Sequence, residues 1–157
     1  MISLIRVDDR LIHGQVQTVW IGATGAKNIM VIDDETKKDE IACQVLKFAL
    51  PSGMKLKILS VDEAVEVWQK AIDSPNNIMV LFKSIKHVWT FHQKGGVFDS
   101  ILVGPTCGKA NTTEIVNGTY FTPEEIEAAN ALDKQGVDIA FQQTLDVKKV
   151  HWKNVRK

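Results

Sequence analysis

A short segment close to the amino terminus concentrates side chains that can bind or carry an anion. It reads Asp8-Asp9-Arg10-Leu11-Ile12-His13-Gly14-Gln15-Val16, with two carboxylates, a guanidinium, an imidazole and a glycine within seven residues. A neutral imidazole nitrogen is a nucleophile toward phosphorus, and the planar fork of an arginine binds phosphate oxygens. Phosphoryl transfer depends mainly on positioning and charge stabilisation, which these groups can supply. We therefore predict that His13 is the nucleophile and that Arg10 stabilises the transferred charge.

The neighbours of His13 can complete such a site. A carboxylate, Asp8 or Asp9, can hold the second ring nitrogen protonated and so orient the first. The pattern predicts a helix from about residue 15 to residue 21, and free N–H groups at a helix amino terminus favour an anion. This placement predicts phosphate contacts at Gly14 and Gln15. The residue types alone leave a plainer interpretation open, in which His13 is a surface or capping residue and both aspartates bind loop amides.

Short apolar runs alternate along the chain with longer amphipathic stretches. Several of these runs are nearly continuous Ile, Leu, Val and Met, as expected for strands covered on both faces. The predicted strands are Ser3 to Val7, Asn28 to Ile32, Lys55 to Leu59, Ile78 to Phe82, Ser100 to Val103 and Val137 to Phe141. The predicted helices are Asp39 to Leu50, Val61 to Ile72, Ser84 to Gln93 and Thr122 to Gln135. The last helix has the clearest signals, with Thr122 as cap, Pro123 at the first position and Gly136 as terminator.

This alternation of strands and helices implies right-handed crossovers between parallel strands. We expect a single α/β domain over residues 1–157, with an open, mostly parallel, doubly wound sheet and helices on both faces. Sites in such sheets lie outside the carboxyl ends of the strands, which is where the segment at residues 8–14 leaves the first strand. Residues 114–121 can form a hairpin around Asn117-Gly118, or a turn that feeds one short strand.

The end of the fourth predicted strand offers further candidates. Ser84 can cap the next helix, or its hydroxyl can touch the phosphate if the first and fourth strands are neighbours. Lys83 can add charge there or lie in solvent. His87 and His92 are five residues apart, which does not match the zinc-binding spacing of four on a helix. We therefore expect two surface histidines and no metal site.

The remaining aromatic residues point to packing and to the chain end. Trp20, Trp68 and Trp89 lie on helical patterns and are expected in the core or along its edge. The basic tail from Lys148 to Lys157 contains His151 and Trp152. It is too short to favour nucleic-acid binding, so we predict a solvated chain end.

Composition excludes several classes of protein. Lys plus Arg and Asp plus Glu both number 19, so the formal net charge is zero and no bulk attraction to nucleic acid is expected. No apolar run approaches the roughly 18 residues of a transmembrane helix, and no secretory signal is visible. Cys43 and Cys107 form neither a CxxC motif nor a disulfide framework. We therefore expect a cytoplasmic protein with reduced thiols.

The opening motif also supports a family assignment. The string from Arg6 to Val16 resembles the active-site segment of the IIB component of the mannose–fructose–sorbose family of the bacterial phosphoenolpyruvate-dependent sugar phosphotransferase system. The likeness extends through Trp20, Asp33-Asp34, Lys57-Ile58-Leu59-Ser60, Phe82-Lys83-Ser84 and Thr122-Pro123-Glu124-Glu125, and so covers essentially the whole chain. No IIA-like extension is visible, so the chain resembles a free-standing IIB phosphocarrier domain.

The resemblance implies an open α/β sheet with a phosphohistidine in the first strand–helix loop, and no cofactor. It implies a carrier that accepts phosphate from a IIA protein or domain. The phosphate then passes to a sugar held by the membrane subunits IIC and IID, so the protein would be peripherally associated with this permease. The phosphorylated histidine of the family falls on His13 and its phosphate-contacting arginine on Arg10. Two loops depart from the family, at Ile85, where proline is frequent, and at Gly104 to Gly108.

The residues also allow two other functions. Asp8-Asp9, Asp33-Asp34 and Lys83 each follow a predicted strand, as in a signalling receiver phosphorylated on aspartate with Mg²⁺. That hypothesis leaves His13-Gly14 unexplained and lacks a lone aspartate after a third strand. A nucleotide-binding domain is the third hypothesis, but the chain has neither a GxGxxG motif nor a P-loop.

Overall fold

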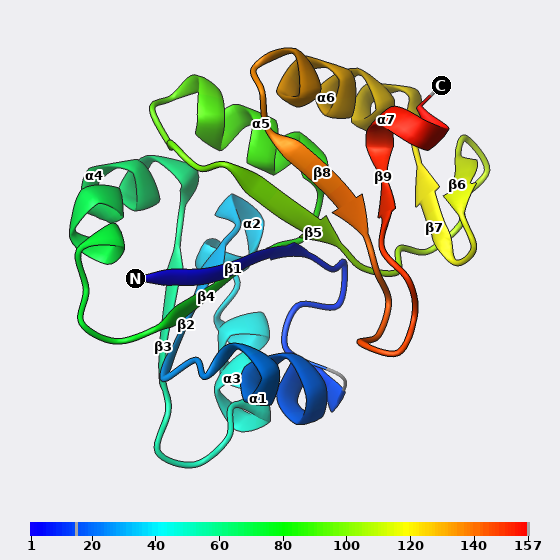
Figure 1. Cartoon of the computed structure of the whole chain (residues 1–157). Coiled ribbons are helices and arrows are strands. Elements are labelled where there is room, and N and C mark those ends of the chain that lie inside the picture. Colours follow the sequence, from blue (N-terminus) through cyan, green and yellow to red (C-terminus); the bar gives the residue numbers. More distant parts are fainter. Residues whose placement is uncertain (15, 157) are drawn as a thin grey trace.

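A central, mostly parallel sheet organises the chain (Figure 1). The computed structural model describes residues 1–14 and 16–156. Within them the main sheet has the strand order β3-β2-β4-β1-β5-β8-β9. The strands are β1 (Ile2–Val7), β2 (Asn28–Ile32), β3 (Lys55–Leu59), β4 (Ile78–Phe82), β5 (Ser100–Val103), β8 (Asp138–Phe141) and β9 (Val150–His151). Neighbouring strands are parallel except β9, which runs antiparallel to β8. Each predicted strand is present, with its bounds shifted by at most one residue.

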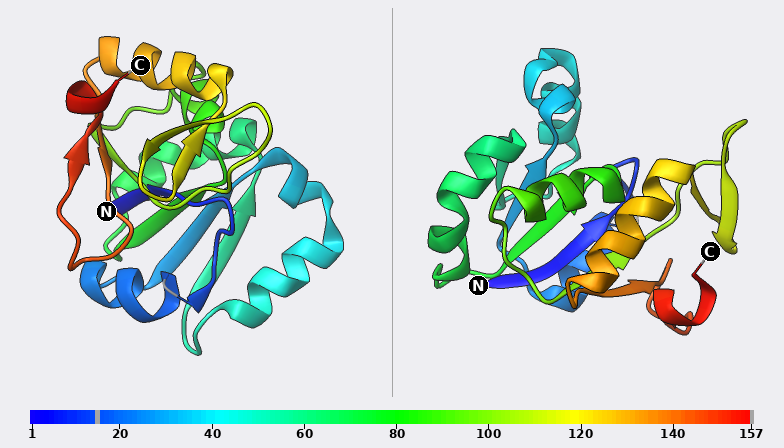
Figure 2. Two further views of the ribbon diagram at one scale, coloured as in Figure 1. Left: turned by 90° about the vertical axis from the view of Figure 1, so that its right-hand side faces the viewer. Right: turned by 90° about the horizontal axis from the view of Figure 1, so that it is seen from above.

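Helices cover both faces of this sheet, as the views in Figure 2 show. They are the π-helix η1 (Val16–Trp20), α1 (Ile21–Thr24), α2 (Asp34–Lys38), α3 (Glu40–Ala49), α4 (Val61–Ile72), α5 (Ile85–Gln93), α6 (Pro123–Lys134) and α7 (Trp152–Val155). The segment η1–α1 and α3 lie on one face, and α4, α5 and α6 lie on the other. The predicted open, doubly wound α/β sheet is therefore confirmed. None of the described helices has the length and apolar character needed to span a bilayer.

Two apolar clusters form the core, one on each side of the sheet. Trp20 and Leu46 belong to one cluster, and Trp68, Phe91 and Leu132 belong to the other. Successive strand residues point to opposite faces, so a strand between two helix layers is expected to be apolar at nearly every position. All five residues of β4 are buried for this reason.

Helix capping follows the sequence signals closely. The Thr122 hydroxyl accepts the Glu125 N–H at 3.2 Å, and the Glu125 carboxylate accepts the Thr122 N–H at 3.1 Å. Pro123, which has no N–H to leave unpaired, occupies the first position of α6. At α4, Ser60 caps the Glu63 N–H at 3.1 Å. These caps confirm the predicted starts of both helices.

The ambiguous region at residues 114–121 is a hairpin. It consists of β6 (Thr113–Val116) paired antiparallel with β7 (Thr119–Phe121). Gly118 has φ of 82°, a conformation that suits glycine in a tight turn. The first of the two alternatives for this segment is therefore confirmed.

The prediction of a solvated carboxyl-terminal tail was wrong. Trp152 is only 1% exposed, and its Nε1 donates to the Asn130 Oδ1 at 3.0 Å. Its ring lies against Phe121 and Phe141, with centroid separations of 6.1 and 6.2 Å. The free energy gained by burying this large aromatic side chain exceeds the cost of ordering the lysine-rich segment around it, so the tail docks on the domain.

Candidate active site

The loop after β1 leaves the middle of the sheet, at its carboxyl edge. The Asp8 N–H donates to the Phe82 carbonyl of β4 at 2.9 Å, and the Leu11 N–H donates to the Asp8 carbonyl at 3.0 Å. Leu11 has φ of 59°, which is unfavourable for a leucine. The side chains of Leu11 and Ile12 are both buried in the core cluster that contains Trp20. The free energy gained by burying these two side chains offsets the cost of the left-handed backbone at Leu11. The buried pair also fixes the loop to the core immediately before His13.

One carboxylate organises the candidate groups. Asp8 is fully buried, and its Oδ2 lies 2.8 Å from the His13 Nε2. Its Oδ1 accepts the backbone N–H of Arg10 at 3.0 Å and lies 3.6 Å from the Arg10 Nε. A carboxylate can only accept hydrogen bonds, so the Nε2 of a neutral His13 carries the ring proton. In this tautomer Nδ1 carries the ring lone pair, which is the nucleophilic form of the imidazole.

The two arginines at the start of the chain have different surroundings. Arg10 is 51% exposed in its side chain and stands beside His13, since both bind the Asp8 carboxylate. Arg6 is fully buried and donates to the carbonyls of Gln142 at 3.0 Å and Gln143 at 3.1 Å. Of these two arginines, only Arg10 has its guanidinium at the surface.

Sequence reasoning did not identify the structural role of Arg6. Its guanidinium lies 4.2 Å from the centroid of the Trp20 ring, in a cation–π contact. Burial lowers the pKa of Arg6 to about 10, against the opposing effect of the Asp8 charge, so the side chain stays charged at neutral pH. A Cβ at Gly104 would lie 2.5 Å from an Arg6 nitrogen, so this packing depends on glycine. The sequence feature that could have indicated this role is the presence of an arginine within an otherwise apolar strand.

The loop after β5 is tied to the loop after β1. The Gly104 N–H donates to the Val7 carbonyl at 2.7 Å, and the Asp9 Oδ2 accepts the Cys107 N–H at 2.8 Å. The negative charge of Asp9 raises the pKa of the Cys107 thiol, and a hydrogen bond from the thiol to Asp9 adds to this effect. Of the two aspartates predicted to orient His13, the structure places Asp8 against the ring and Asp9 against Cys107.

The remaining predicted phosphate contacts differ in their surroundings. Strands β1 and β4 are neighbours, as the Ser84 hypothesis requires. The Ser84 hydroxyl accepts the Lys86 N–H at 3.2 Å and donates to the Glu125 Oε2 at 3.0 Å, so it is occupied in capping. Gly14 is exposed, and Gln15 lies outside the described residues. Phosphate contacts at Ser84, Gly14 and Gln15 stay predictions.

The acidic residues of the receiver hypothesis do not converge. Asp33 caps α2, accepting from the N–H of Thr36 at 3.0 Å and from its hydroxyl at 2.6 Å, and lies 3.3 Å from the His87 Nδ1. Asp34 accepts the Val61 N–H at 2.8 Å. Because β4 separates β2 from β1, these carboxylates are not beside Asp8. The geometry therefore favours the histidine over an aspartate as the phosphate carrier.

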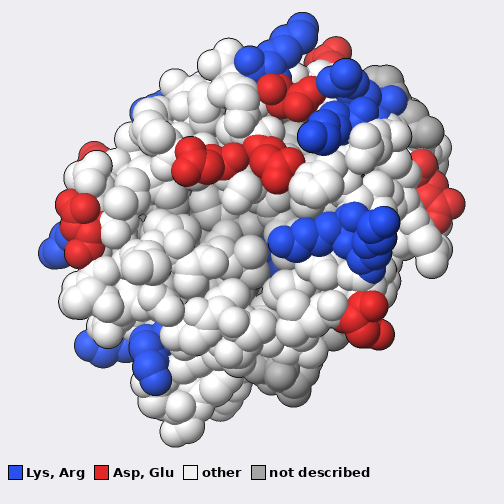
Figure 3. Space-filling view, viewed as in Figure 1, with Lys and Arg blue, Asp and Glu red and all other residues white. Residues whose placement is uncertain are grey.

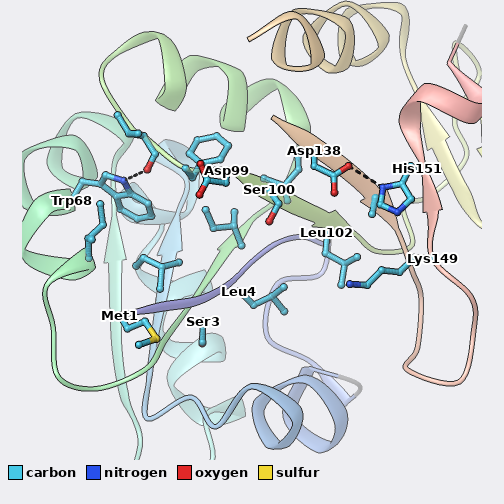
Figure 4. A pocket seen from close by; sticks show the side chains of 17 residues that line it. Met1, Ser3, Leu4, Trp68, Asp99, Ser100, Leu102, Asp138, Lys149 and His151 are labelled. Carbon is cyan, nitrogen blue, oxygen red and sulfur yellow. Dashed lines mark hydrogen bonds and ion pairs between the residues drawn. The ribbon is translucent and has the colours of Figure 1, made fainter. Parts of the chain in front are cut away.

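A cavity lies elsewhere, between β1 and β5 toward their amino ends (Figure 4). It has a volume of about 530 Å³, and its walls include Leu4, Trp68 and Asp99 together with the Asp138–His151 ion pair, whose atoms are 2.9 Å apart. Asp8, Arg10 and His13 do not line it. On the face seen in Figure 3, acidic and basic side chains alternate around a broad uncharged centre. The His13 loop is thus a surface site rather than part of this cavity.

Comparison with known proteins identifies the family of the chain. A family model described as the PTS system sorbose subfamily IIB component matches residues 2–157. The sorbose-specific EIIB component of Klebsiella pneumoniae is 32% identical over 138 residues, which cover 88% of this chain and 84% of the relative. The mannose-specific EIIAB component of Escherichia coli K12 is 29% identical over 143 residues, covering 91% of this chain and 44% of that protein.

A solved structure shows the same fold. The crystal structure of the IIBSor domain of the Klebsiella pneumoniae sorbose permease superposes with a TM-score of 0.90 at 29% identity, covering 98% of this chain and 94% of that one. The chain belongs to the IIB components of the sorbose subfamily of the phosphotransferase system, which are phosphoryl carriers of sugar uptake that act through a phosphohistidine.

Proposed function

We propose that His13 is the residue that carries the phosphoryl group, and that it reacts through Nδ1. The proposal rests on the 2.8 Å contact between the Asp8 Oδ2 and the His13 Nε2. This hydrogen bond fixes the ring orientation and keeps the proton on Nε2. The free Nδ1 lone pair is then directed away from the buried carboxylate.

The transfer step balances within these groups. The Nδ1 lone pair attacks the phosphorus held by the donor, the new N–P bond forms, and the bond from phosphorus to the donor breaks as the donor nitrogen regains its electron pair. The His13 ring keeps its Nε2 proton and gains positive charge. Asp8 is buried beside that proton, so it stabilises the charged phosphohistidine. The reverse electron flow releases the phosphoryl group to the next acceptor.

Arg10 stabilises the charge on the moving phosphoryl group. Its guanidinium shares the Asp8 carboxylate with His13, and the half-exposed side chain can turn toward phosphate oxygens. Backbone N–H groups at Gly14 and Gln15 are expected to add donors. Ser84 has a lesser part, since its hydroxyl is bonded to Glu125.

The donor and acceptor follow from the system to which the chain belongs. We infer that a IIA protein or domain phosphorylates His13, and that IIC and IID present the sugar that receives the phosphate. One relative is named an EIIAB component, which joins both functions in its name. The carrier then works at the cytoplasmic face of the membrane, bound peripherally to the permease. An open site suits this task because a partner histidine must come within bonding distance of Nδ1.

The proposal is tested by phosphorylating the protein with its phosphorylated IIA partner and locating the phosphate by mass spectrometry. We expect the label on His13, labile to acid and stable to alkali, and lost in His13→Ala. Nitrogen-15 NMR of the phosphorylated ring should show the phosphorus on Nδ1. His87→Ala is the matched control, since its ring also lies within 4 Å of a buried aspartate. A label that survives in His13→Ala, or that alkali releases, would refute the assignment and direct attention to Asp8 and Asp9.

A further inference from the structure

Helix α3 presents an apolar stripe to solvent. Ile41, Val45 and Phe48 are 78%, 60% and 88% exposed. They are spaced four and three residues apart, so they share one face of the helix. Leu46 lies on the opposite face, buried in the core. We call Ile41, Val45 and Phe48 the α3 stripe.

Such a stripe is costly to leave in water. Scattered apolar residues are normal on a protein surface, but three large ones side by side favour association. Both views of Figure 2 place α2 and α3 at the periphery of the molecule, where a second molecule can reach them. The α3 stripe is therefore the part of the described surface best suited to bury apolar area against a partner.

The charges beside the stripe indicate which partner it fits. Glu40 lies at the amino end of α3 and Lys47 near its carboxyl end, and their seven-residue spacing puts both on the same flank of the stripe. Both are exposed, and neither forms an ion pair with another described residue. The α3 helix thus carries a negative and a positive charge, both unpaired, in a fixed order along one side of an apolar face.

This pattern is complementary to itself in one orientation. When two identical helices lie antiparallel about a two-fold axis, the same flanks meet, and Glu40 of each copy lies opposite Lys47 of the other. In a parallel pair the two-fold axis runs along the helices, so the flanks that carry Glu40 and Lys47 lie on opposite sides of the interface and neither charge meets its complement. We propose that two copies of this chain associate through antiparallel α3 helices, with the α3 stripe buried between them and two Glu40–Lys47 ion pairs along its edge.

The structure also bounds the strength of this association. Ten residues of α-helix are about 15 Å long, so the helix pair alone buries less area than a standard stable interface. Exposed ion pairs contribute little to affinity and serve mainly to set orientation. We therefore expect a reversible dimer with a Kd of roughly 10 µM to 1 mM. The α3 stripe points away from the core cluster that contains Leu11 and Ile12 of the His13 loop, because Leu46 occupies the buried side of the helix.

Sedimentation equilibrium of the full chain tests this association. We expect the mass to rise from 17.5 kDa toward twice that value with increasing concentration. Val45→Glu and Phe48→Ser should stay at 17.5 kDa throughout. Val97→Glu is the matched control, because Val97 is 71% exposed but lies in the loop before β5, and it should dimerise like the wild type. Circular dichroism checks that each variant is folded.

Charge reversal tests the antiparallel arrangement separately. Glu40→Lys and Lys47→Glu should each weaken the association by about tenfold, and the double variant should restore it. A chain that stays monomeric up to roughly 1 mM, or a dimer that Val45→Glu leaves intact, would overturn the proposal. Failure of the double variant to recover would overturn it as well, because the ion pairs then do not form as stated. Phosphorylation of His13 is expected in all variants, so this outcome is independent of the proposed function.

Discussion

The two ends of β1 differ in how they are held. At the carboxyl end, β1 is paired on both sides, with Val7 aligned to Phe82 of β4 and Val103 of β5. Toward the amino end it pairs only with β4, because its pairing with β5 is limited to Arg6 and Val7. The strands separate there and leave the cavity of about 530 Å³. The site that must be positioned thus lies at the tightly bonded end.

This contrast fits the chemistry of a carrier. A cavity suits a small ligand, but a phosphoryl group passed between two proteins needs a nucleophile that a partner side chain can approach. His13 meets this need with a ring that is 16% exposed and is fixed from below by a buried carboxylate. We infer that the strand pairing at the carboxyl end of β1 holds His13 in position, and that a surrounding cavity is not needed for this.

The largest effect is expected from Asp8→Asn. The amide can still accept the Arg10 N–H, so the loop should fold, but it can present a donor to the His13 Nε2 and place the ring proton on Nδ1. By analogy with the aspartate of a serine-protease triad, transfer from phosphorylated IIA should slow by about 10² to 10⁴-fold. Rapid-quench measurement of the phosphorylation rate checks this expectation.

A matched substitution at the other end of the sheet provides the control. Asp138 also binds a histidine, His151, at 2.9 Å, but beside the amino-end cavity. Asp138→Asn removes an exposed ion pair, so it should cost at most about 1 kcal/mol in the free energy of unfolding and leave the transfer rate unchanged. Equal slowing in both variants would mean that the two ends of β1 are not functionally distinct.

A smaller effect is expected at Arg10. Arg10→Ala should slow transfer by about 10²-fold, near the low end for loss of a charge-stabilising donor, because the side chain is half exposed. Arg10→Lys should recover part of this loss, since an ammonium keeps the charge without the two-pronged contact. Rates measured with saturating phosphorylated IIA separate this effect from weaker docking.

Arg156→Lys is the matched control for Arg10. Arg156 is similarly exposed, at 55%, and pairs with Asp133 at 2.8 Å, away from the loop. It should transfer phosphate at the wild-type rate. If neither Arg10 variant differs from this control, the guanidinium has no part in the step.

The regular elements were predictable because their determinants are local. The capping box at Thr122 and Glu125 lies within one turn of chain, and the buried strand β4 is apolar at every position. The chemistry of the site was also local, since Asp8, Arg10 and His13 lie within six residues. The short helix α2, which Asp33 caps, was missed because one capping residue before five polar residues is a weak signal.

The unpredicted features depend on contacts between distant parts of the chain. Arg6 reaches the carbonyls of Gln142 and Gln143, and Trp152 packs on Phe121 and Phe141. Residue types and spacing do not specify such partners. The choice of Asp8 over Asp9 as the residue that holds His13 has the same origin, because it depends on which carboxylate the strand buries.

The last and smallest effect concerns the link between the loops after β1 and β5. The carboxylate of Asp9 raises the pKa of the exposed Cys107 thiol, so the wild-type protein needs a higher pH than an ordinary cysteine to form the thiolate. Asp9→Asn removes that charge but keeps an oxygen that can accept the Cys107 N–H, so the pKa should fall. Because only the thiolate is alkylated, the rate of reaction with iodoacetamide at pH 8 should rise about twofold to fivefold.

Cys43, whose Sγ donates to the Thr36 carbonyl at 3.1 Å, provides the control within the same chain and should react at an unchanged rate. Mass spectrometry resolves the two thiols. An unchanged Cys107 rate would mean that Asp9 does not lie against this thiol in solution, and would contradict the Asp9–Cys107 contact between the two loops at the carboxyl end.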